Sequence, residues 1–481
     1  MYAVLQRFTP GSRVPASGWR RLRLAFALAA GALAGVCAPR AHADADAAAW
    51  MEVPGASAEL VPEPDLGGRV MLYRAGRRDG PPVVLVHGLG QNGARDWSRL
   101  IPALADGYAV YALDLPGFGQ SDKGNRLYSP ASFARAIENV IGPRVGGRFT
   151  LIGHSMGGAV SLAYAAAYPE RIQRLILVDM AGVLQRAVYA EFLSRVGTQA
   201  ATGGYVEDAP WFTSYLHRAL TRAESVPLSS GPLLGSAAVR QQFFRGEPNA
   251  IAAYTLVGHD FSRALRSVAA PTLLIWGSED KVAPLRTGQM AAATMPNARL
   301  TILQGAGHAP MLQMPERFNP IVLDELRGRR DERPHTPQKA ALDGDRIGAC
   351  DGERGRHFTG EYKELRLDRC PDAQVAQARI GFLLVRDSTV RIVDSHIGNG
   401  IDARNSRIEL TAGSVGGSPA LGLNASDVDA AGTRFESEGA IAVNRGSVRV
   451  ALSLSVAELA RAGAEPRYAH RIITLAPRAR W

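Results

Sequence analysis

Between residues 69 and 326, short apolar runs alternate with segments that have the residue pattern of a helix. The runs are rich in valine, leucine and isoleucine and occupy 83–86, 108–113, 149–152, 174–178, 272–276 and 299–303. The helical segments fall at about 95–105, 131–141, 156–168, 285–294 and 315–327. Strand and helix in alternation predict a mostly parallel sheet with helices on both faces, and therefore an α/β domain over 44–326.

The alternation is interrupted between about residues 182 and 266. This insertion has no clear strand pattern and carries several aromatic residues, which are Trp211, Phe212, Tyr215, Phe243 and Phe244. A helical insertion at the carboxyl edge of a parallel sheet would lie over a site built at that edge. We therefore expect residues 182–266 to form a helical lid.

The pattern changes after a charged, proline-bearing stretch at 327–341, which we interpret as a linker. The segment that follows shows a weak repeat of short β-rich stretches. Its copies align at Val385, Ala403, Leu423 and Val443, with spacings of 18, 20 and 20 residues. This period, with Gly, Asn and Ser at the turns, predicts a C-terminal all-β domain over 342–481 that is a short parallel β-helix. A small antiparallel sandwich is the alternative.

The first 43 residues have the organisation of an export signal peptide. Three arginines within 20–23 precede an apolar run over 24–36, and an Ala-His-Ala pattern follows at 41–43. The run is too short to span a bilayer comfortably, which disfavours a membrane anchor. A lipoprotein signal at Cys37 and a twin-arginine signal remain open. We expect an exported protein, periplasmic or secreted, with no integral membrane span after signal removal.

Loss of the signal would change both the charge and the cysteine count. The formal charge of +10 would fall to about +4, because the signal holds six arginines and no acidic residue. The high charge of the full chain is therefore no indication of a nucleic-acid partner. Cys350 and Cys370 would remain, and an even pair in an exported protein favours a disulfide. Two unrelated buried thiols are the alternative.

One serine stands where a strand pattern passes directly into a helix pattern. The apolar run 149–152 is followed by Gly153-His154-Ser155-Met156-Gly157 and then by an alanine-rich stretch. The glycines relieve the crowding of such a turn. A serine hydroxyl becomes a nucleophile when an imidazole accepts its proton and a carboxylate orients that imidazole. Loops at the carboxyl ends of later strands supply candidates for both, Asp280 and His308.

Residues 69–326 resemble the α/β-hydrolase superfamily, especially its lidded esterases, carbon–carbon bond hydrolases and haloperoxidase-like members. Five motifs carry the resemblance in order: His87-Gly88-Leu89-Gly90, Asp114-Leu115-Pro116-Gly117-Phe118-Gly119-Gln120-Ser121, Gly153-His154-Ser155-Met156-Gly157, Trp276-Gly277-Ser278-Glu279-Asp280 and Gly307-His308. The resemblance implies Ser155 as nucleophile, His308 as general acid and base, and Asp280 as orienting carboxylate. It also implies an oxyanion hole made by the main-chain N–H groups of Leu89 and Met156.

Several nearby residues allow other assignments. Asp179, after the run 174–178, is an alternative orienting acid, and Glu279 adjoins Asp280. We interpret His87 and His154 as residues that shape loops. The family's usual glutamate five residues after the histidine is Gln313 in this chain, at a position that supports the site rather than taking part in the chemistry.

The segment Gly88-Leu89-Gly90-Gln91-Asn92-Gly93 also matches the G-x-G-x-x-G fingerprint of dinucleotide-binding proteins, and Asp114 stands where a ribose-binding acid would. The histidine before the glycines and the Asp-Leu-Pro-Gly segment fit the hydrolase motifs better. An exported protein would also rarely meet free NAD. The sequence has no H-E-x-x-H motif and no acidic cluster with metal-ligand spacing. We therefore expect neither a cofactor nor a metal.

These observations favour an exported serine hydrolase. We expect it to cleave carboxylic esters of small to medium apolar substrates through an acyl-enzyme, although amide, thioester and carbon–carbon bond cleavage use the same three residue types. The alternative is a binding or scaffolding protein whose C-terminal domain recognises a glycan or a cell-envelope polymer. The acidic residues of that domain show no pairing that would favour carbohydrate chemistry. An inactive relative is disfavoured by the complete set of catalytic residue types.

Overall fold

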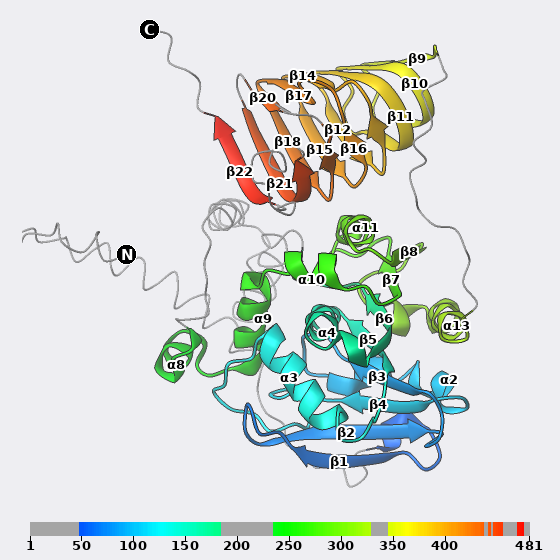
Figure 1. The fold of residues 1–481 in the computed structure, drawn as a ribbon, viewed down its shortest axis with the longest axis vertical. Helices are drawn as coiled ribbons and strands as arrows, with labels where there is room; N and C mark the ends of the chain where they lie inside the picture. The colour runs from blue at the N-terminus through cyan, green and yellow to red at the C-terminus, as the bar shows by residue number, and fades with distance from the viewer. Residues whose placement is uncertain are drawn as a thin grey trace, which may run out of the picture.

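A computed structural model describes residues 48–183, 234–328, 345–436, 441–443, 446–455 and 469–475. The expected signal peptide, residues 184–233 of the expected lid and residues 329–341 of the expected linker lie outside these ranges. Figure 1 shows an α/β part that ends with α13 and an all-β part that begins with β9. Within the described ranges, the helices are all too short or too polar to cross a membrane.

An eight-stranded sheet forms the centre of the α/β part, in the order β1-β2-β4-β3-β5-β6-β7-β8. Strand β1 (Ser57–Pro62) lies at one edge of the sheet, and β2 (Arg69–Gly76) pairs antiparallel with both β1 and β4. The other six are mutually parallel and coincide with the six predicted runs: β3 (Pro82–Val86), β4 (Ala109–Leu113), β5 (Phe149–His154), β6 (Ile172–Val178), β7 (Thr272–Gly277) and β8 (Ala298–Leu303). The α/β prediction is therefore confirmed, whereas β1 was not predicted because most of its residues are exposed.

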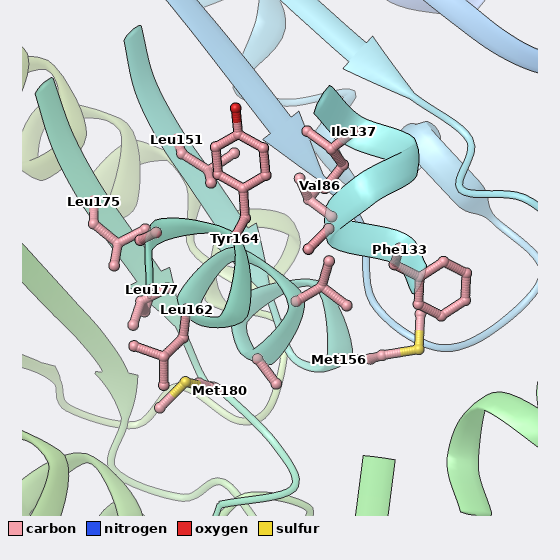
Figure 2. Packing of buried hydrophobic residues seen from close by; sticks show 14 of the residues in the cluster. Val86, Phe133, Ile137, Leu151, Met156, Leu162, Tyr164, Leu175, Leu177 and Met180 are labelled. Carbon is pink, nitrogen blue, oxygen red and sulfur yellow. The ribbon is translucent and has the colours of Figure 1, made fainter. Parts of the chain in front are cut away.

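Helices cover both faces of this sheet, since each parallel strand is apolar on both sides. On one face, α3 (Pro130–Ile141), α4 (Met156–Ala167) and α11 (Leu285–Thr294) contribute to a core around Val86, Leu151 and Leu177 (Figure 2). On the other, α2 (Ile101–Ala105) and α13 (Pro315–Leu326) pack against Leu85 and Ile152. Burial of each large apolar side chain stabilises the fold by roughly 1.5–3 kcal/mol, so the sheet is a rigid support for its loops.

Three helices lie between β6 and β7 in the described part of the expected lid: α8 (Ala237–Phe244), α9 (Pro248–Gly258) and α10 (Ser262–Ser267). The helical character that we predicted for this segment is present there. Ile251, Leu256 and Leu265 are fully buried in the main core of the α/β part. Helices α9 and α10 therefore belong to the body of this domain.

The all-β part is a curled sheet in which the pairings among β9 to β21 are parallel and β22 is antiparallel to β21. Its strands are β9 (Ile347–Asp351), β10 (His357–Asp368), β11 (Ala373–Arg386), β12 (Thr389–Val393), β13 (His396–Ile397), β14 (Ile401–Arg404), β15 (Arg407–Thr411), β16 (Ser414–Val415), β17 (Leu421–Asn424), β18 (Ser426–Ala431), β19 (Arg434–Phe435), β20 (Ile441–Val443), β21 (Gly446–Ser455) and β22 (Ala469–Leu475). The parallel pairings exclude an antiparallel sandwich and confirm the all-β prediction.

The repeat found in the sequence is the pairing register of this sheet. Val385 pairs with Ala403, Ala403 with Leu423, and Leu423 with Val443, which are the four aligned positions. At the next corner, the main-chain N–H of Ser388 donates to the Oγ of Ser406, and that of Ser406 to the Oγ of Ser426. The serines recur because each satisfies a buried main-chain donor one repeat earlier.

Cys350 and Cys370 form a disulfide, and both are buried in the core of the all-β part. The bond closes a loop with a sequence separation of 20 residues. Replacing both cysteines by alanine should lower the free energy of unfolding by about 3 kcal/mol, because the unfolded chain regains the entropy of that loop. Urea unfolding with and without a reductant measures this. The reductant should destabilise the parent and leave the variant unchanged; a parent insensitive to reductant would contradict the prediction.

Candidate active site

Ser155 lies in a strained turn between β5 and α4, with a φ of 53° and a ψ of −120°. A positive φ in a residue other than glycine costs of order 1–3 kcal/mol and is common at functional sites. The turn is possible because the residues two positions before and two positions after Ser155 are glycines, Gly153 and Gly157. A Cβ on Gly153 would lie 2.3 Å from the Gly157 carbonyl oxygen, and one on Gly157 would lie 2.3 Å from that of His87. The strand and helix therefore approach closely enough to present Ser155 at the sheet edge.

The imidazole of His308 lies between Ser155 and Asp280. Its Nε2 is 2.8 Å from the Oγ of Ser155, and its Nδ1 is 2.8 Å from the Oδ2 of Asp280. An ionised carboxylate can only accept a hydrogen bond, so Nδ1 carries the proton and donates a hydrogen bond to Asp280. Nε2 is then unprotonated, and its lone pair faces the serine hydroxyl. The structure thus brings together the three side chains that the sequence proposed, from positions 155, 280 and 308.

The carboxylate of Asp280 is fixed by the turn that follows β7. Its Oδ1 accepts hydrogen bonds from the main-chain N–H groups of Val282, at 2.7 Å, and Ala283, at 2.9 Å. The other oxygen, Oδ2, is left to accept from His308. Glu279, the adjacent acid, has an exposed side chain and makes no such contact. The geometry therefore favours Asp280 over Glu279 as the partner of the imidazole.

Asp179, the alternative acid, lies at the end of β6 and is fully buried. Its Oδ1 accepts from the main-chain N–H of Gly277 at 2.9 Å, three residues before Asp280. Burial raises the pKa of Asp179 well above its usual range, and the nearby charge of Asp280 raises it further. Asp179 therefore binds the main chain of Gly277, whereas Asp280 faces the His308 imidazole.

The loop of Leu89 and the start of α4, which carry the two predicted oxyanion-hole donors, lie beside Ser155. Met156 is the first residue of α4, a position whose N–H has no carbonyl partner within the helix. Leu89 follows Gly88 in the loop after β3, and a Cβ on Gly88 would lie 3.2 Å from the Cβ of Ser155. This close approach places the loop of Leu89 directly beside the serine. The structure therefore places Met156 and the loop of Leu89 close to Ser155.

The remaining polar residues of the motifs hold the loops in place. His87 accepts from the main-chain N–H of Leu115 through Nε2, at 2.9 Å, and its Nδ1 lies 2.7 Å from the Gly88 carbonyl oxygen. Asp114, the ribose-binding candidate, accepts from the N–H groups of Ala94 and Gln120. Its carboxylate is thus occupied by the loops on either side, which accounts for its place in the hydrolase motif.

Gln313 takes over a supporting role in the loop of His308. Its Oε1 accepts a hydrogen bond from the main-chain N–H of Gly307, at 2.7 Å, so the residue before His308 is fixed from the following helix. An amide oxygen serves this purpose as well as a carboxylate would. The departure from the family's glutamate therefore leaves the geometry of His308 intact.

Residues 81–315 of the chain match the sequence model of a protein family, the alpha/beta hydrolase fold family. An uncharacterised protein of Mycobacterium tuberculosis is 31% identical over 268 residues, which span 50% of this chain and 74% of the relative. The chain belongs to the α/β-hydrolase family. A second relative of this α/β hydrolase is the pimeloyl-[acyl-carrier protein] methyl ester esterase of Nitrosomonas europaea, which is 30% identical over 50% of the chain and 93% of the relative.

Among solved structures, the α/β hydrolase is similar to a thermophilic esterase from Thermogutta terrifontis, with 24% identity and a TM-score of 0.41. That alignment covers 56% of the chain and 98% of the esterase. The matched family region, residues 81–315, ends before the all-β part begins at β9.

One acidic residue beside the site was not found from the sequence. Asp96 follows the His87-Gly88-Leu89-Gly90 motif, and its Oδ2 accepts from the main-chain N–H of Gly88 at 3.1 Å. It belongs to no motif that we quoted, and it lies in the segment that we predicted to be helical at about 95–105. An acidic residue shortly after a glycine loop was the only signal that the sequence offered.

Proposed function

We propose that this α/β hydrolase cleaves carboxylic esters of small to medium apolar substrates by a Ser-His-Asp acyl-enzyme mechanism. The observation that carries the proposal is the position of the His308 imidazole, 2.8 Å from both the Ser155 hydroxyl and the Asp280 carboxylate. This is the arrangement in which a serine becomes a nucleophile near neutral pH.

The chemistry follows from these contacts. Nε2 of His308 accepts the proton of Ser155 as its Oγ attacks the ester carbonyl carbon, and Asp280 stabilises the imidazolium that forms. The negative charge on the carbonyl oxygen is met by the N–H groups of Leu89 and Met156, each worth about 2.7–4 kcal/mol in comparable sites. His308 then gives its proton to the leaving alcohol. Water, activated by the same imidazole, hydrolyses the acyl-enzyme and restores Ser155.

Esters are favoured over other acyl compounds by the relative from Nitrosomonas europaea, whose name describes a methyl ester esterase. The identity of 30% over 93% of that protein supports the class of bond and leaves the acyl group to experiment. We test the class with a series of p-nitrophenyl esters of increasing acyl length, together with labelling by a fluorophosphonate probe. Absence of both hydrolysis and labelling in the mature chain would rule out the proposed function.

We further propose that the protein acts outside the cytoplasm and that its curled parallel sheet is a short parallel β-helix. Export is supported by the composition of residues 1–43 and by the disulfide between Cys350 and Cys370, a bond that persists in oxidising compartments. The β-helix is supported by pairing partners that recur about one repeat apart along the chain, as in Val390, Ile408, Val428 and Val448.

The pH dependence of hydrolysis should follow His308. Burial lowers the pKa of His308 from its ordinary value of 6.5, and the hydrogen bond to Asp280 offsets part of that effect. The imidazole must be neutral to accept the serine proton, so activity is lost as the pH falls through this pKa. We expect kcat/KM for a neutral p-nitrophenyl ester to fall on the acid side with a midpoint below 6.5. A midpoint above 6.5 would contradict the role of burial.

A further inference from the structure

His154, the residue before the serine, contacts the main chain of His308. Its Nε2 is 2.7 Å from the carbonyl oxygen of His308, and a carbonyl oxygen can only accept, so Nε2 carries a proton. The side chain is only 8% exposed. A buried imidazole that donates to the backbone of His308, the proposed general base, restrains where the His308 ring can lie.

The other side of the His154 ring faces the loop that contains Gly88 and Leu89. Its Nδ1 lies 3.7 Å from the Oδ2 of Asp96, and that same oxygen accepts from the N–H of Gly88, at 3.1 Å. A Cβ on Gly88 would lie 2.9 Å from Nδ1, so the glycine at this position makes room for the ring. The edge of the ring also meets the fully buried indole of Trp97.

We propose that His154 and Asp96 are positioning residues that join the backbone of His308 to the loop carrying Leu89. The brace, defined as His154 with Asp96, fixes the distance between the group that accepts the serine proton and the donors that meet the oxyanion. This inference rests on the proposed function, because it assigns a role within the same site. Neither side chain contacts the substrate, and both act through the main chain.

The electrostatic environment of His308 gives the brace a readout that a purely structural role would not have. The charged and titratable groups that influence His308 are Asp280, His154 and Asp96. Burial lowers the pKa of His308 most; a charge on His154 lowers that pKa further, whereas the carboxylate of Asp96 raises it. We call the fall of kcat/KM on the acid side of the pH profile the acid limb. Removing His154 should therefore move the midpoint of the acid limb to higher pH, and removing the charge of Asp96 should move it to lower pH.

The experiment compares three full-length test variants with one control variant. His154→Phe keeps the ring volume and removes the donor, and kcat should fall roughly 10- to 100-fold with little change in KM, because small misplacements of reacting groups are costly. His154→Gln retains an N–H that can reach the His308 carbonyl and should recover most of kcat. Asp96→Asn should shift the acid limb downward. His396→Gln, in the all-β part, is the matched control with parental activity.

Two outcomes decide the matter. Opposite shifts of the acid limb in His154→Phe and Asp96→Asn, with recovery by glutamine, support the brace; unchanged kcat and pH profiles in both overturn it. The His308 pKa can also be followed by proton NMR through its hydrogen bond to Asp280, which requires no substrate. If the parent neither hydrolyses esters nor reacts with a fluorophosphonate, the proposed function fails, and the NMR midpoints still decide whether His154 and Asp96 act on His308.

Discussion

Replacing Ser155 by alanine should lower kcat for a p-nitrophenyl ester by roughly 10³-fold or more and leave KM nearly unchanged. The expected loss is large because the hydroxyl supplies the bond that forms the acyl-enzyme, and His308 and Asp280 have no other nucleophile to activate. The N–H groups of Leu89 and Met156 remain in place, so some acceleration over the uncatalysed reaction should persist. Steady-state kinetics on the purified mature chain measure both parameters.

Ser161→Ala is the matched control for this variant. Ser161 lies on α4 and is fully buried, and its hydroxyl has no hydrogen-bond partner in the described part of the chain. Loss of that hydroxyl should leave activity and fluorophosphonate labelling at the parental level. If Ser155→Ala were still labelled, or kept more than about a tenth of the parental kcat, another residue would have to be the nucleophile.

The α/β fold could be predicted because two features of the sequence mark its strands. The strands themselves are apolar runs, and the loops that follow them carry recognisable motifs. Buried parallel strands are apolar on both faces, so runs such as 83–86 and 272–276 stand out from their surroundings. Strand β1 does not, since five of its six residues are exposed or half-buried. The repeats of the all-β part were visible for a related reason, because equivalent residues stack in register.

The candidate site was predictable in part. Ser155, Asp280 and His308 each lie beside a strand end with a distinctive motif, so their convergence follows from the topology of a parallel sheet. The contacts of His154 with His308 and Asp96 could not be predicted, because they depend on ring orientation and not on spacing. The sequence motifs already favoured Asp280 over Asp179, and the structure places Asp280 against the imidazole.

The contact between the two parts of the molecule was also invisible in the sequence. Helix α11 lies on the side of the α/β part that faces the curled sheet (Figure 1). Arg286, near its start, is 7% exposed and donates through Nε to the Oγ1 of Thr411, at 2.9 Å. Its Nη2 donates to the carbonyl oxygens of Leu410 and Asp429 and to the carboxylate of Asp429. A truncation after residue 330 would therefore expose an arginine that the full chain buries.

This interface lies close to Asp280, the proposed orienting carboxylate. Helix α11 begins at Leu285, directly after the turn in which Val282 and Ala283 donate to Asp280. One turn further along α11, Met290 packs against Gly432 of the curled sheet, where an added Cβ would lie 3.1 Å from its Cγ. The sheet thus packs against the helix that follows Asp280, and we expect this contact to restrain the turn that holds the Asp280 carboxylate.

Replacing Arg286 by methionine should therefore destabilise the full chain and reduce its activity. Methionine fills similar volume and leaves the carbonyls of Leu410 and Asp429 without their donor, at a cost of about 2 kcal/mol. For a protein of this size we expect the melting temperature to fall by about 2 °C. Calorimetry measures this fall, and Arg78→Met, at an exposed position in the loop before β3, is the control. Equal melting temperatures for the two variants would show that the sheet does not hold α11. A lower kcat in Arg286→Met, with labelling of Ser155 retained, would show that the restraint reaches Asp280.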